Sequence, residues 1–518
     1  MKGLFWEGNR MTDFRKSRNT QKEKTGAAND KKDRKRSGSF AEKRFSKGAA
    51  PFSNRTQRVE REIHTRNDGQ KSGIVPRRVA LDILLDVSKN NAYAQLALEK
   101  RLSQIQLERR DVALVTQLVY GTIEKRITLD YRINQFLKSE EPLDATIKEI
   151  LRMGVYQLFY LDRIPDMAAV DESVTLTRTM GFEGMTGLVN AVLRNMLRQK
   201  DELKWPDPAS DQIQYLSVMC SAPEALCRLL VSAYGFDRAK EILQYNKKDR
   251  FQSIRVNRLR CDDARLKHLL RDDGVEFVPG LIDGTYRVTR AGDLSKMRGY
   301  QNGLFCIQGE SSVLAARAVD AKPGQSVLDA CAAPGGKTAV LSEMMNDTGR
   351  VYAWDTHSHR VDLIRGMVNR LKLENVRPAL RDARSARPEM NKTLDAALID
   401  APCSGTGVIY EKPDLKYRVT EQEIQELIAI QYQILEAVSP MVKTGGTLVY
   451  STCSILPEEN EKQIQAFLER HSDYKIESLD YLLPEQLKGK EGKYGLQLFT
   501  DRDDIDGFYI AKLRRVNE

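Results

Sequence analysis

The C-terminal half of the chain alternates short apolar, β-rich runs with helical segments, and this alternation constrains the fold more than any other feature of the sequence. It begins at "PGQSVLDACAAPGGK" (residues 323–337) and continues to the C-terminus. Because each helix returns the chain so that the next strand can run in the same direction, such an alternation is typical of parallel sheets. The sequence therefore predicts a doubly wound, mostly parallel α/β sheet of the Rossmann-like class over residues 301–518.

The N-terminal half has a different period. In "RRVALDILLDVSK", Val79, Ile83 and Val87 recur every fourth residue and form one apolar helical face. Similar segments follow to about residue 200 without strand alternation, so this part is expected to be all-α. The motif "WPDPAS" (205–210) marks a linker, and residues 253–280 have the pattern of a strand, a helix and a strand.

A chain of 518 residues is too long for one ordinary core, so a multidomain protein is expected. The expected segments are a disordered basic tail (1–74), an all-α domain (75–205), a helical linker (206–249), a small α/β subdomain (250–300) and the large α/β domain (301–518).

The positive charge of the chain is concentrated in the tail. Residues 1–75 hold 20 Lys and Arg against 9 Asp and Glu, whereas the rest holds 62 against 63, out of totals of 82 and 72. With few large apolar residues, the tail cannot bury enough surface to offset its ordering entropy. It is either a solubilising extension or a flexible arm that binds phosphates and loses affinity as salt rises.

The cysteine pattern indicates reduced thiols. The seven cysteines are odd in number, form no CxxC pair and lie apart from the five histidines, so neither a disulfide framework nor a metal site is expected. The sequence has no apolar run of 18 residues and no signal-peptide core at its start, which predicts a cytoplasmic protein without a membrane segment. Five cysteines are interpreted as small buried hydrophobic residues: Cys220, Cys227, Cys261, Cys306 and Cys331.

A glycine turn and three acidic residues mark a predicted ligand site. "QSVLDACAAPGGKTAVLSEMM" (325–345) has the pattern of a strand, a glycine turn and a helix, without the G-x-G-x-x-G spacing of a dinucleotide site. In such sheets, ligands bind beyond the carboxyl ends of the strands. Three predicted strands end near acids: Asp355 suits two ribose hydroxyls, Asp382 is placed to meet a base edge, and Asp400 follows. This pattern favours an adenosine cofactor of neutral or positive charge, S-adenosylmethionine.

Cys403 and Cys453 differ from the other cysteines because each follows a predicted strand on the cofactor side of the sheet, in "LIDAPCSGTG" (398–407) and "LVYSTCS" (448–454). A thiolate is a strong nucleophile that can add to an electrophilic ring carbon such as C6 of a pyrimidine. The addition makes C5 electron-rich enough to take a methyl group from a sulfonium donor. The two positions are physically near-equivalent, so their spacing leaves open which thiol attacks.

Three motifs resemble the cofactor, fourth and sixth motifs of the RNA cytosine-5 methyltransferases of the NOL1/NOP2/sun group: "DACAAPGGKT", "DAPCSGTG" and "YSTCSILPEENE". The likeness covers about residues 250–518. The helical part resembles the NusB RNA-binding fold through "RRVALDILLDV", "QLVYGTI", "ILRMGVYQLFYLDRIPDMAAVDESV" and "GLVNAVLRN". The two domains in this order resemble bacterial small-subunit rRNA methyltransferases, which methylate one cytosine of 16S rRNA, conventionally position 967.

The resemblance implies a role for each thiol. In this family the sixth-motif cysteine attacks, so Cys453 is the expected nucleophile that adds to C6. Cys403 is expected to help release the product by promoting loss of the C5 proton and elimination of the enzyme thiol. Asp400 is expected to hydrogen-bond the N3/N4 edge of the cytosine and to stabilise the charge that develops as sulfur adds.

The resemblance also implies that S-adenosylmethionine is held by the glycine loop and the strand-end acids. The expected cofactor-binding residues are Cys331, Ala332, Ala333, Pro334, Gly335, Gly336, Lys337, Asp355, Asp382 and Asp400. The side chain of Lys337 is expected to face either the donor or the substrate.

One loop departs from the family pattern. After "GTGVI" the family carries a basic stretch with His before "PD" and Trp after the Lys, whereas this chain has "YEKPDLKY" (410–417), with Glu411 and Tyr417. Because this loop is expected to face the substrate, its contacts to RNA are expected to differ while the chemistry stays the same.

The expected partner is 16S rRNA, naked or in an early small-subunit assembly intermediate, because a stacked cytosine hides C5 and C6 and a mature subunit would bury the site. The chain is expected to act as a monomer. Two alternatives are kept: cytosine-5 methylation of another rRNA or tRNA site, and a non-catalytic RNA-binding assembly factor. The intact cysteines, acids and glycine loop argue against the second.

Overall fold

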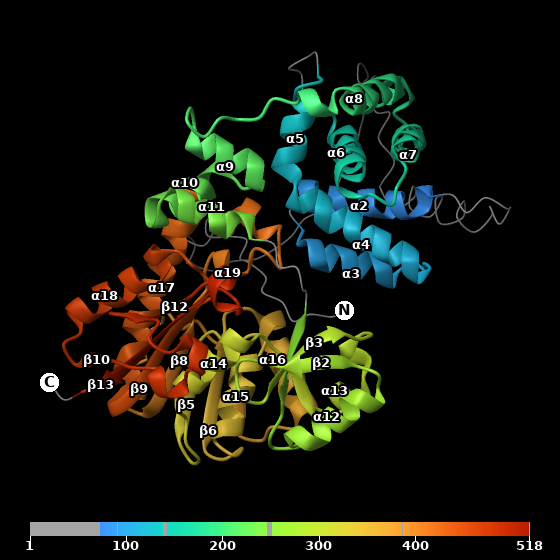
Figure 1. Ribbon diagram of the computed structural model, residues 1–518. Helices are drawn as coiled ribbons and strands as arrows, with labels where there is room; N and C mark the ends of the chain where they lie inside the picture. Colours follow the sequence, from blue (N-terminus) through green and yellow to red (C-terminus); the bar gives the residue numbers. More distant parts are fainter. Residues whose placement is uncertain (1–72, 91, 138–141, 246–250, 386, 517–518) are drawn as a thin grey trace, which may run out of the picture. The chain divides into compact units, whose positions relative to one another are not determined.

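A computed structural model describes residues 73–516, except 91, 138–141, 246–250 and 386. The basic tail expected over residues 1–74 therefore lies almost wholly outside the described residues. The described chain from Ile74 onward belongs to one compact unit, whose helices and strands are labelled in Figure 1.

The first part of this unit is all-α, as the apolar periodicity predicted (Figure 1). Its α-helices in the described residues are α2 (Ile74–Asn90), α3 (Ala94–Ser103), α4 (Arg109–Glu124), α5 (Arg126–Asn134), α6 (Ala145–Tyr160), α7 (Asp166–Thr179) and α8 (Thr186–Arg198). Helix α6 is buried along most of its length. Its Arg152 is paired with Glu149 and with Asp130 of α5, at 2.6 Å each, so the buried guanidinium charge is compensated.

Three further helices pack beside the loop that follows Cys453. They are α9 (Gln212–Cys220), α10 (Glu224–Tyr234) and α11 (Phe236–Gln244). Leu226 and Leu230 share an apolar cluster with Ile455 and Leu456, and the Tyr234 hydroxyl donates to the Ile455 carbonyl. Within the described ranges no single helix is both long and apolar enough to cross a membrane; only α9 and α10 taken together, bent by 118°, meet the length and composition criteria.

A small antiparallel sheet precedes the large domain, with the strand order β2-β3-β1-β4. Its elements are β1 (Gln252–Val256), α12 (Asp263–Asp272), β2 (Glu276–Pro279), β3 (Thr285–Arg290), α13 (Arg298–Gln301) and β4 (Phe305–Ile307). The first three match the strand, helix and strand expected over 253–280. β4 pairs with β1, so this sheet extends past the expected boundary at residue 300.

The large sheet has the order β11-β12-β13-β9-β8-β5-β6-β7, with β10 paired to β13. Its strands are β5 (Ser326–Asp329), β6 (Arg350–Asp355), β7 (Val376–Leu380), β8 (Leu394–Asp400), β9 (Val442–Thr452), β10 (Tyr474–Glu477), β11 (Glu491–Gly492), β12 (Gly495–Leu498) and β13 (Phe508–Arg515). Strands β5 to β9 pair in parallel, whereas β13 joins β9 antiparallel. The sheet is therefore mixed around a parallel, Rossmann-like centre, in agreement with the predicted fold class.

Helices cover both faces of this sheet. They are α14 (Glu310–Ala318), α15 (Gly336–Met344), α16 (Ser358–Leu371), α17 (Glu421–Val438) and α18 (Glu461–Arg470), with the short α19 (Thr500–Asp503) before β13. Residues of α14, α15 and α16 form one apolar cluster with the sheet, and residues of α17 and α18 form another. Because β5, β6, β8 and β9 run in parallel, their carboxyl ends lie at one edge, which brings Asp329, Asp355, Asp400 and the loop of Cys453 together.

Candidate active site

The glycine loop between β5 and α15 is held against the end of β6. The Ala332 amide donates to the Trp354 carbonyl at 2.8 Å, and the Gly335 amide donates to the Ala332 carbonyl at 2.7 Å. Gly335 has φ +109°, a conformation that L side chains rarely adopt, and a Cβ there would contact Met367 of α16 at 3.3 Å. Glycine therefore allows this tight approach of the loop to α16.

Asp329 was not predicted as a site residue, but it lies next to the glycine loop. It ends β5 and is fully buried. Thr338 donates to its Oδ2 at 2.6 Å, while its Oδ1 has no hydrogen-bond partner among the described residues. Burial, more than any other cause, raises the pKa of Asp329 to about 7. Its position as the last residue of an apolar strand, like that of Asp355 and Asp400, was the available signal.

Two of the three acids expected to bind the cofactor, Asp355 and Asp382, have different hydrogen-bond partners. Asp355 is 3% exposed at the end of β6; it accepts from the His357 amide at 3.2 Å, and Arg360 lies 3.4 Å away. Asp382 instead accepts hydrogen bonds from the Arg384 side chain, at 2.7 Å for the shortest, and from its amide. These bonds lower the pKa of Asp382, so its carboxylate is engaged with Arg384 in the structure.

Three acidic side chains lie near Cys331 in the glycine loop. Burial raises the pKa of Cys331 well above its usual value, and Asp355, Asp329 and Asp400 raise it further. Cys331 is thus a neutral thiol beside three carboxyl groups, of which Asp355 lies near Arg360 and Asp400 is paired with Lys337. Carboxyl oxygens suit a cationic ligand, and Asp329 Oδ1, which has no hydrogen-bond partner among the described residues, offers it an acceptor. The residues present therefore fit the positively charged sulfonium cofactor that the sequence predicted.

Lys337 connects the glycine loop to the end of β8. Its Nζ lies 2.8 Å from Asp400 Oδ2, and Ser451 Oγ donates to Asp400 Oδ1 at 2.9 Å. Both oxygens of Asp400 are thereby oriented by partners from β9 and α15. The sequence left open whether Lys337 faces the methyl donor or the substrate. In the structure its side chain lies toward Asp400, the residue predicted to contact the cytosine.

The two thiols predicted to act together are in contact. Cys403 Sγ lies 3.4 Å from Cys453 Sγ. Cys403 is 1% exposed, whereas Cys453 is more accessible. The hydrogen bond from Cys403 lowers the pKa of Cys453, and Lys412 and Lys337 lower it further. The same bond, together with burial and Glu459, raises the pKa of Cys403 well above its usual value. The surroundings therefore favour a thiolate at Cys453 and a thiol at Cys403.

The loop after Cys403 packs directly on the backbone of Cys453. The Gly407 amide donates to the Cys453 carbonyl at 2.9 Å. A Cβ on Gly407 would lie 2.2 Å from the Gly507 carbonyl oxygen and 2.9 Å from that of Cys453. The absence of a side chain at this position lets the two loops close on each other.

The second half of the 410–417 loop contacts the helical part of the chain. Asp414 accepts from the Ala94 amide at 3.2 Å, Lys416 donates to the Glu124 carbonyl at 2.7 Å, and the Tyr417 hydroxyl lies 3.1 Å from Ser221 Oγ. These residues bind the helical part of the chain and are buried against it. Local sequence patterns do not predict contacts between residues so far apart in the chain.

Lys416 makes this contact dependent on pH. Burial lowers its pKa to about 7, compared with about 10.4 in an unfolded chain. Between these values the unfolded chain binds more protons, so this group makes stability rise with pH. We compare the Tm of Lys416→Met with that of the natural protein at each pH. This difference, variant minus natural, should be more positive at pH 7 than at pH 9 by about 2–4 °C. The lost hydrogen bond to Glu124 costs the same at both pH values; equal Tm differences at pH 7 and pH 9 would contradict the argument.

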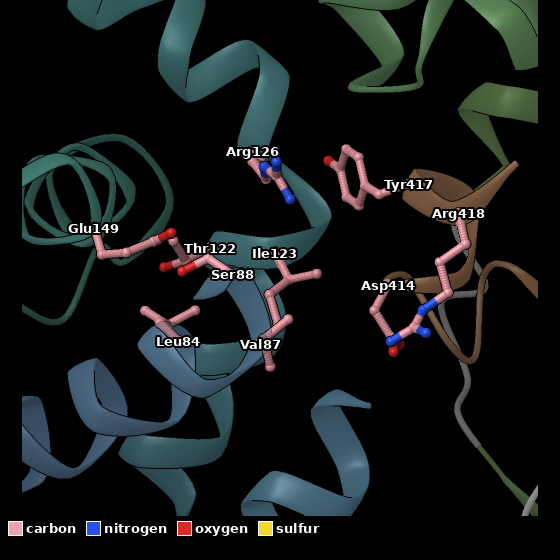
Figure 2. A pocket seen from close by; sticks show the side chains of 10 residues that line it. All are labelled: Leu84, Val87, Ser88, Thr122, Ile123, Arg126, Glu149, Asp414, Tyr417 and Arg418. Atoms are coloured by element: carbon pink, nitrogen blue, oxygen red, sulfur yellow. The ribbon is translucent and has the colours of Figure 1, made fainter. Parts of the chain in front are cut away.

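A pocket lies at the same junction and is not lined by either thiol (Figure 2). The residues that line it are Leu84, Val87, Ser88, Thr122, Ile123, Arg126, Glu149, Asp414, Tyr417 and Arg418. It contains none of the predicted site residues. Two guanidinium groups and two carboxylates share it, so it presents no single charge to a ligand.

Comparison with known proteins gives the family of both parts. Residues 316–514 match the family described as 16S rRNA methyltransferase RsmB/F, and residues 75–198 match the NusB family. The "Probable ribosomal RNA small subunit methyltransferase B" of Bacillus subtilis (strain 168) is 37% identical over 442 residues, which cover 85% of this chain and 98% of that protein.

Two solved structures share the fold. The crystal structure of PH0851 has a TM-score of 0.72 and 27% identity, and the match covers 86% of this chain and 100% of that one. NSun6 from Pyrococcus horikoshii with SFG has a TM-score of 0.51 and 21% identity, over 57% of this chain and 99% of that one. The catalytic fold and the NusB-family helices thus agree with the comparisons. The chain belongs to the ribosomal RNA small subunit methyltransferase B family, whose methyl donor is S-adenosylmethionine.

Proposed function

We propose that this rRNA methyltransferase methylates C5 of one cytosine of 16S rRNA, position 967 by family resemblance. The observation that carries the proposal is the pair of thiols 3.4 Å apart, placed beside carboxylates that favour a sulfonium donor. Methylation of a base nitrogen or of a ribose hydroxyl needs no thiol. A thiolate beside a second, protonated thiol suits a reaction in which sulfur first adds to carbon and later leaves it.

In the proposed reaction, Cys453 Sγ forms a bond to C6 of the cytosine, and the electron pair of the C5–C6 double bond becomes available at C5. S-adenosylmethionine, when bound, supplies the methyl group that C5 accepts. A base then takes the C5 proton, the electron pair of the C5–H bond re-forms the C5–C6 double bond, the C6–sulfur bond breaks, and Cys453 leaves as a thiolate. Cys403, buried at its side, assists this release.

Asp400 is proposed to receive the amino edge of the cytosine. A carboxylate has about four acceptor positions, and the hydrogen bonds from Lys337 and Ser451 use one on each oxygen. Acceptor capacity therefore remains for the N4 amino group. Lys337 holds the carboxylate in place and keeps a positive charge near the ring as sulfur adds.

The proposed cofactor residues are those of the loop from Cys331 to Lys337, with Asp355 for the ribose hydroxyls. Asp329 joins them, because its buried Oδ1 has no partner among the described residues. Asp382 can contribute only if its carboxylate is shared with, or released from, Arg384. Asp355 needs no such rearrangement.

The proposed substrate is naked 16S rRNA or an early small-subunit intermediate, bound by a monomer. The cytosine must be extruded or lie in a loop, because its C5 and C6 are stacked in a helix. The NusB-family helices and the small sheet would orient the RNA around the strand ends.

Tritium release from 16S rRNA labelled with [5-³H]cytosine tests the reaction. Methylation at C5 replaces the hydrogen there, so release should depend on added S-adenosylmethionine and match the methyl groups incorporated. RNA labelled at C6 should release none. Incorporation of methyl groups without tritium release would assign another atom, and neither signal would favour the non-catalytic assembly factor. Bisulfite sequencing of RNA from a deletion strain would then locate the base; loss at another rRNA or tRNA cytosine would overturn the assigned position.

A further inference from the structure

Glu459 is a buried carboxylate between the two thiol loops that the mechanism above does not use. It is 0% exposed and lies on the short helical turn Pro457–Glu459 after β9. Its Oε1 accepts from the Ser404 amide at 2.8 Å and from Gln431 Nε2 at 3.0 Å. Its Oε2 accepts from the hydroxyls of Ser404 and Ser454.

These contacts join the two loops at equivalent points. Ser404 is the residue directly after Cys403, and Ser454 is the residue directly after Cys453. One carboxylate thus binds the neighbour of each thiol. The two serine hydroxyls also lie 3.2 Å apart, so a shift of either loop would break contacts to the other.

The donors to Glu459 make its Oε1 an acceptor. A backbone amide and a side-chain amide nitrogen can only donate, and both meet Oε1. The orientation of Gln431 is consistent, because its Nε2 also donates to the Pro402 carbonyl at 2.9 Å. The pKa of Glu459 is raised by burial and held down by these hydrogen bonds, with burial the larger effect.

The charge of Glu459 acts unequally on the two sulfurs. The hydrogen bond with Cys453 and burial raise the pKa of Cys403, and Glu459 raises it further. Two cations, Lys337 and Lys412, lower the pKa of Cys453, which Asp400 opposes. Tyr450 completes the surroundings: its hydroxyl donates to the Glu459 carbonyl at 2.7 Å, and its pKa is raised well above the usual value.

We propose that Glu459 is a positioning residue that holds the two thiol loops in register and keeps Cys403 protonated, so that Cys453 is the sulfur that becomes a thiolate. The proposal rests on the proposed two-thiol reaction but concerns the free enzyme. In this proposal, contacts formed on folding decide which of the two thiols attacks, because their positions in the sequence are near-equivalent. Glu459 touches neither substrate nor cofactor in this assignment and acts through the cysteines.

The test measures alkylation of each thiol by iodoacetamide in the full-length protein, without RNA, between pH 6 and pH 10. Peptide mass spectrometry quantifies Cys403 and Cys453 separately. In the natural protein Cys453 should react first and at lower pH. In Glu459→Gln the preference for Cys453 should fall roughly 10-fold or more, which corresponds to about one pKa unit, and the onset of Cys403 alkylation should move to lower pH.

Two further variants separate charge from packing. Glu458→Gln is the matched control: Glu458 is the neighbouring carboxylate, binds Lys462 at 2.8 Å, and should leave both alkylation profiles unchanged. Glu459→Asp keeps the charge with a shorter side chain and should retain more of the preference than Glu459→Gln. A profile of Glu459→Gln that equals the natural one overturns the proposal, as does an equal loss in Glu459→Asp and Glu459→Gln.

If Glu459→Gln does not fold, Ser454→Ala and Ser404→Ala remove single contacts and keep the carboxylate. Each should raise the reactivity of Cys403 while the protein still binds S-adenosylmethionine; unchanged reactivity in both would also overturn the proposal. Because alkylation needs no RNA, its outcome is independent of the methylated atom. Tritium release tests that atom separately, so failure of the proposed function is distinguishable from failure of this inference.

Discussion

Replacement of Cys453 by alanine is expected to abolish methylation, with a loss on the order of 10⁴-fold or more in kcat, the scale seen when a covalent nucleophile is removed. Among the two thiols, Cys453 is the more accessible, and its pKa is lowered by the hydrogen bond from Cys403 and by Lys412 and Lys337. Without this sulfur no bond to C6 forms, and C5 stays too electron-poor to accept a methyl group.

The adduct itself provides the measurement. With 16S rRNA that carries 5-fluorocytosine, fluorine blocks loss of the C5 substituent, so the natural enzyme should be trapped as a protein–RNA adduct that intact mass spectrometry detects. Cys453→Ala should form no adduct. Cys220→Ala is the matched control, because this thiol lies on α9 and has a pKa raised by burial to about 11. Peptide mapping that places the base on Cys403 would exchange the proposed roles.

Replacement of Cys403 by alanine is expected to have the opposite effect on the adduct. Attack by Cys453 remains possible, but release is impaired, so a covalent complex with unmodified cytosine RNA should accumulate while turnover falls on the order of 10²-fold or more. A denaturing gel should show the complex with Cys403→Ala and little of it with the natural enzyme.

The contact of 3.4 Å between the sulfurs adds a pH dependence to this prediction. The hydrogen bond with Cys403 lowers the pKa of Cys453. Without this partner, the pKa of Cys453 rises and its thiolate fraction near neutral pH falls. The rate of adduct formation by Cys403→Ala should therefore increase up to a higher pH than in the natural enzyme. An unchanged profile, or turnover without adduct, would contradict the release role of Cys403.

Much of the fold follows from local patterns in the sequence. A period of about four residues predicts helices such as α2, and apolar runs between helices predict the parallel strands β5 to β9. The carboxyl ends of parallel strands meet at one edge, so Asp355, Asp400 and Cys453 were placed on the correct side of the sheet. The antiparallel addition of β13 beside β9 was not predicted, because its pairing depends on a partner far along the chain.

Asp382 shows that a correct strand-end position does not predict what the side chain contacts. Its place after β7 matches the expectation, but its carboxylate is bound by Arg384, two residues along the chain. Asp329 was not predicted, although it lies in the motif "DACAAPGGKT". Only the structure shows that its carboxyl group is buried and that one oxygen lacks a partner among the described residues. The position of a residue at the end of a strand can be predicted from the sequence, whereas the hydrogen-bond partner of its side chain cannot.

The sequence by itself determined the class of fold, the family and the cofactor, and it predicted the two cysteines, because periodicity and motif spacing are properties of neighbouring residues. Only the tertiary structure decided that the sulfurs of Cys403 and Cys453 lie in contact, that Glu459 lies between their loops, and that residues 414–417 are buried against the helical domain. The physical reason is that a pKa depends on burial and on charges within a few ångströms. Those neighbours come from strands, turns and helices that are distant in the chain, and folding alone brings them together.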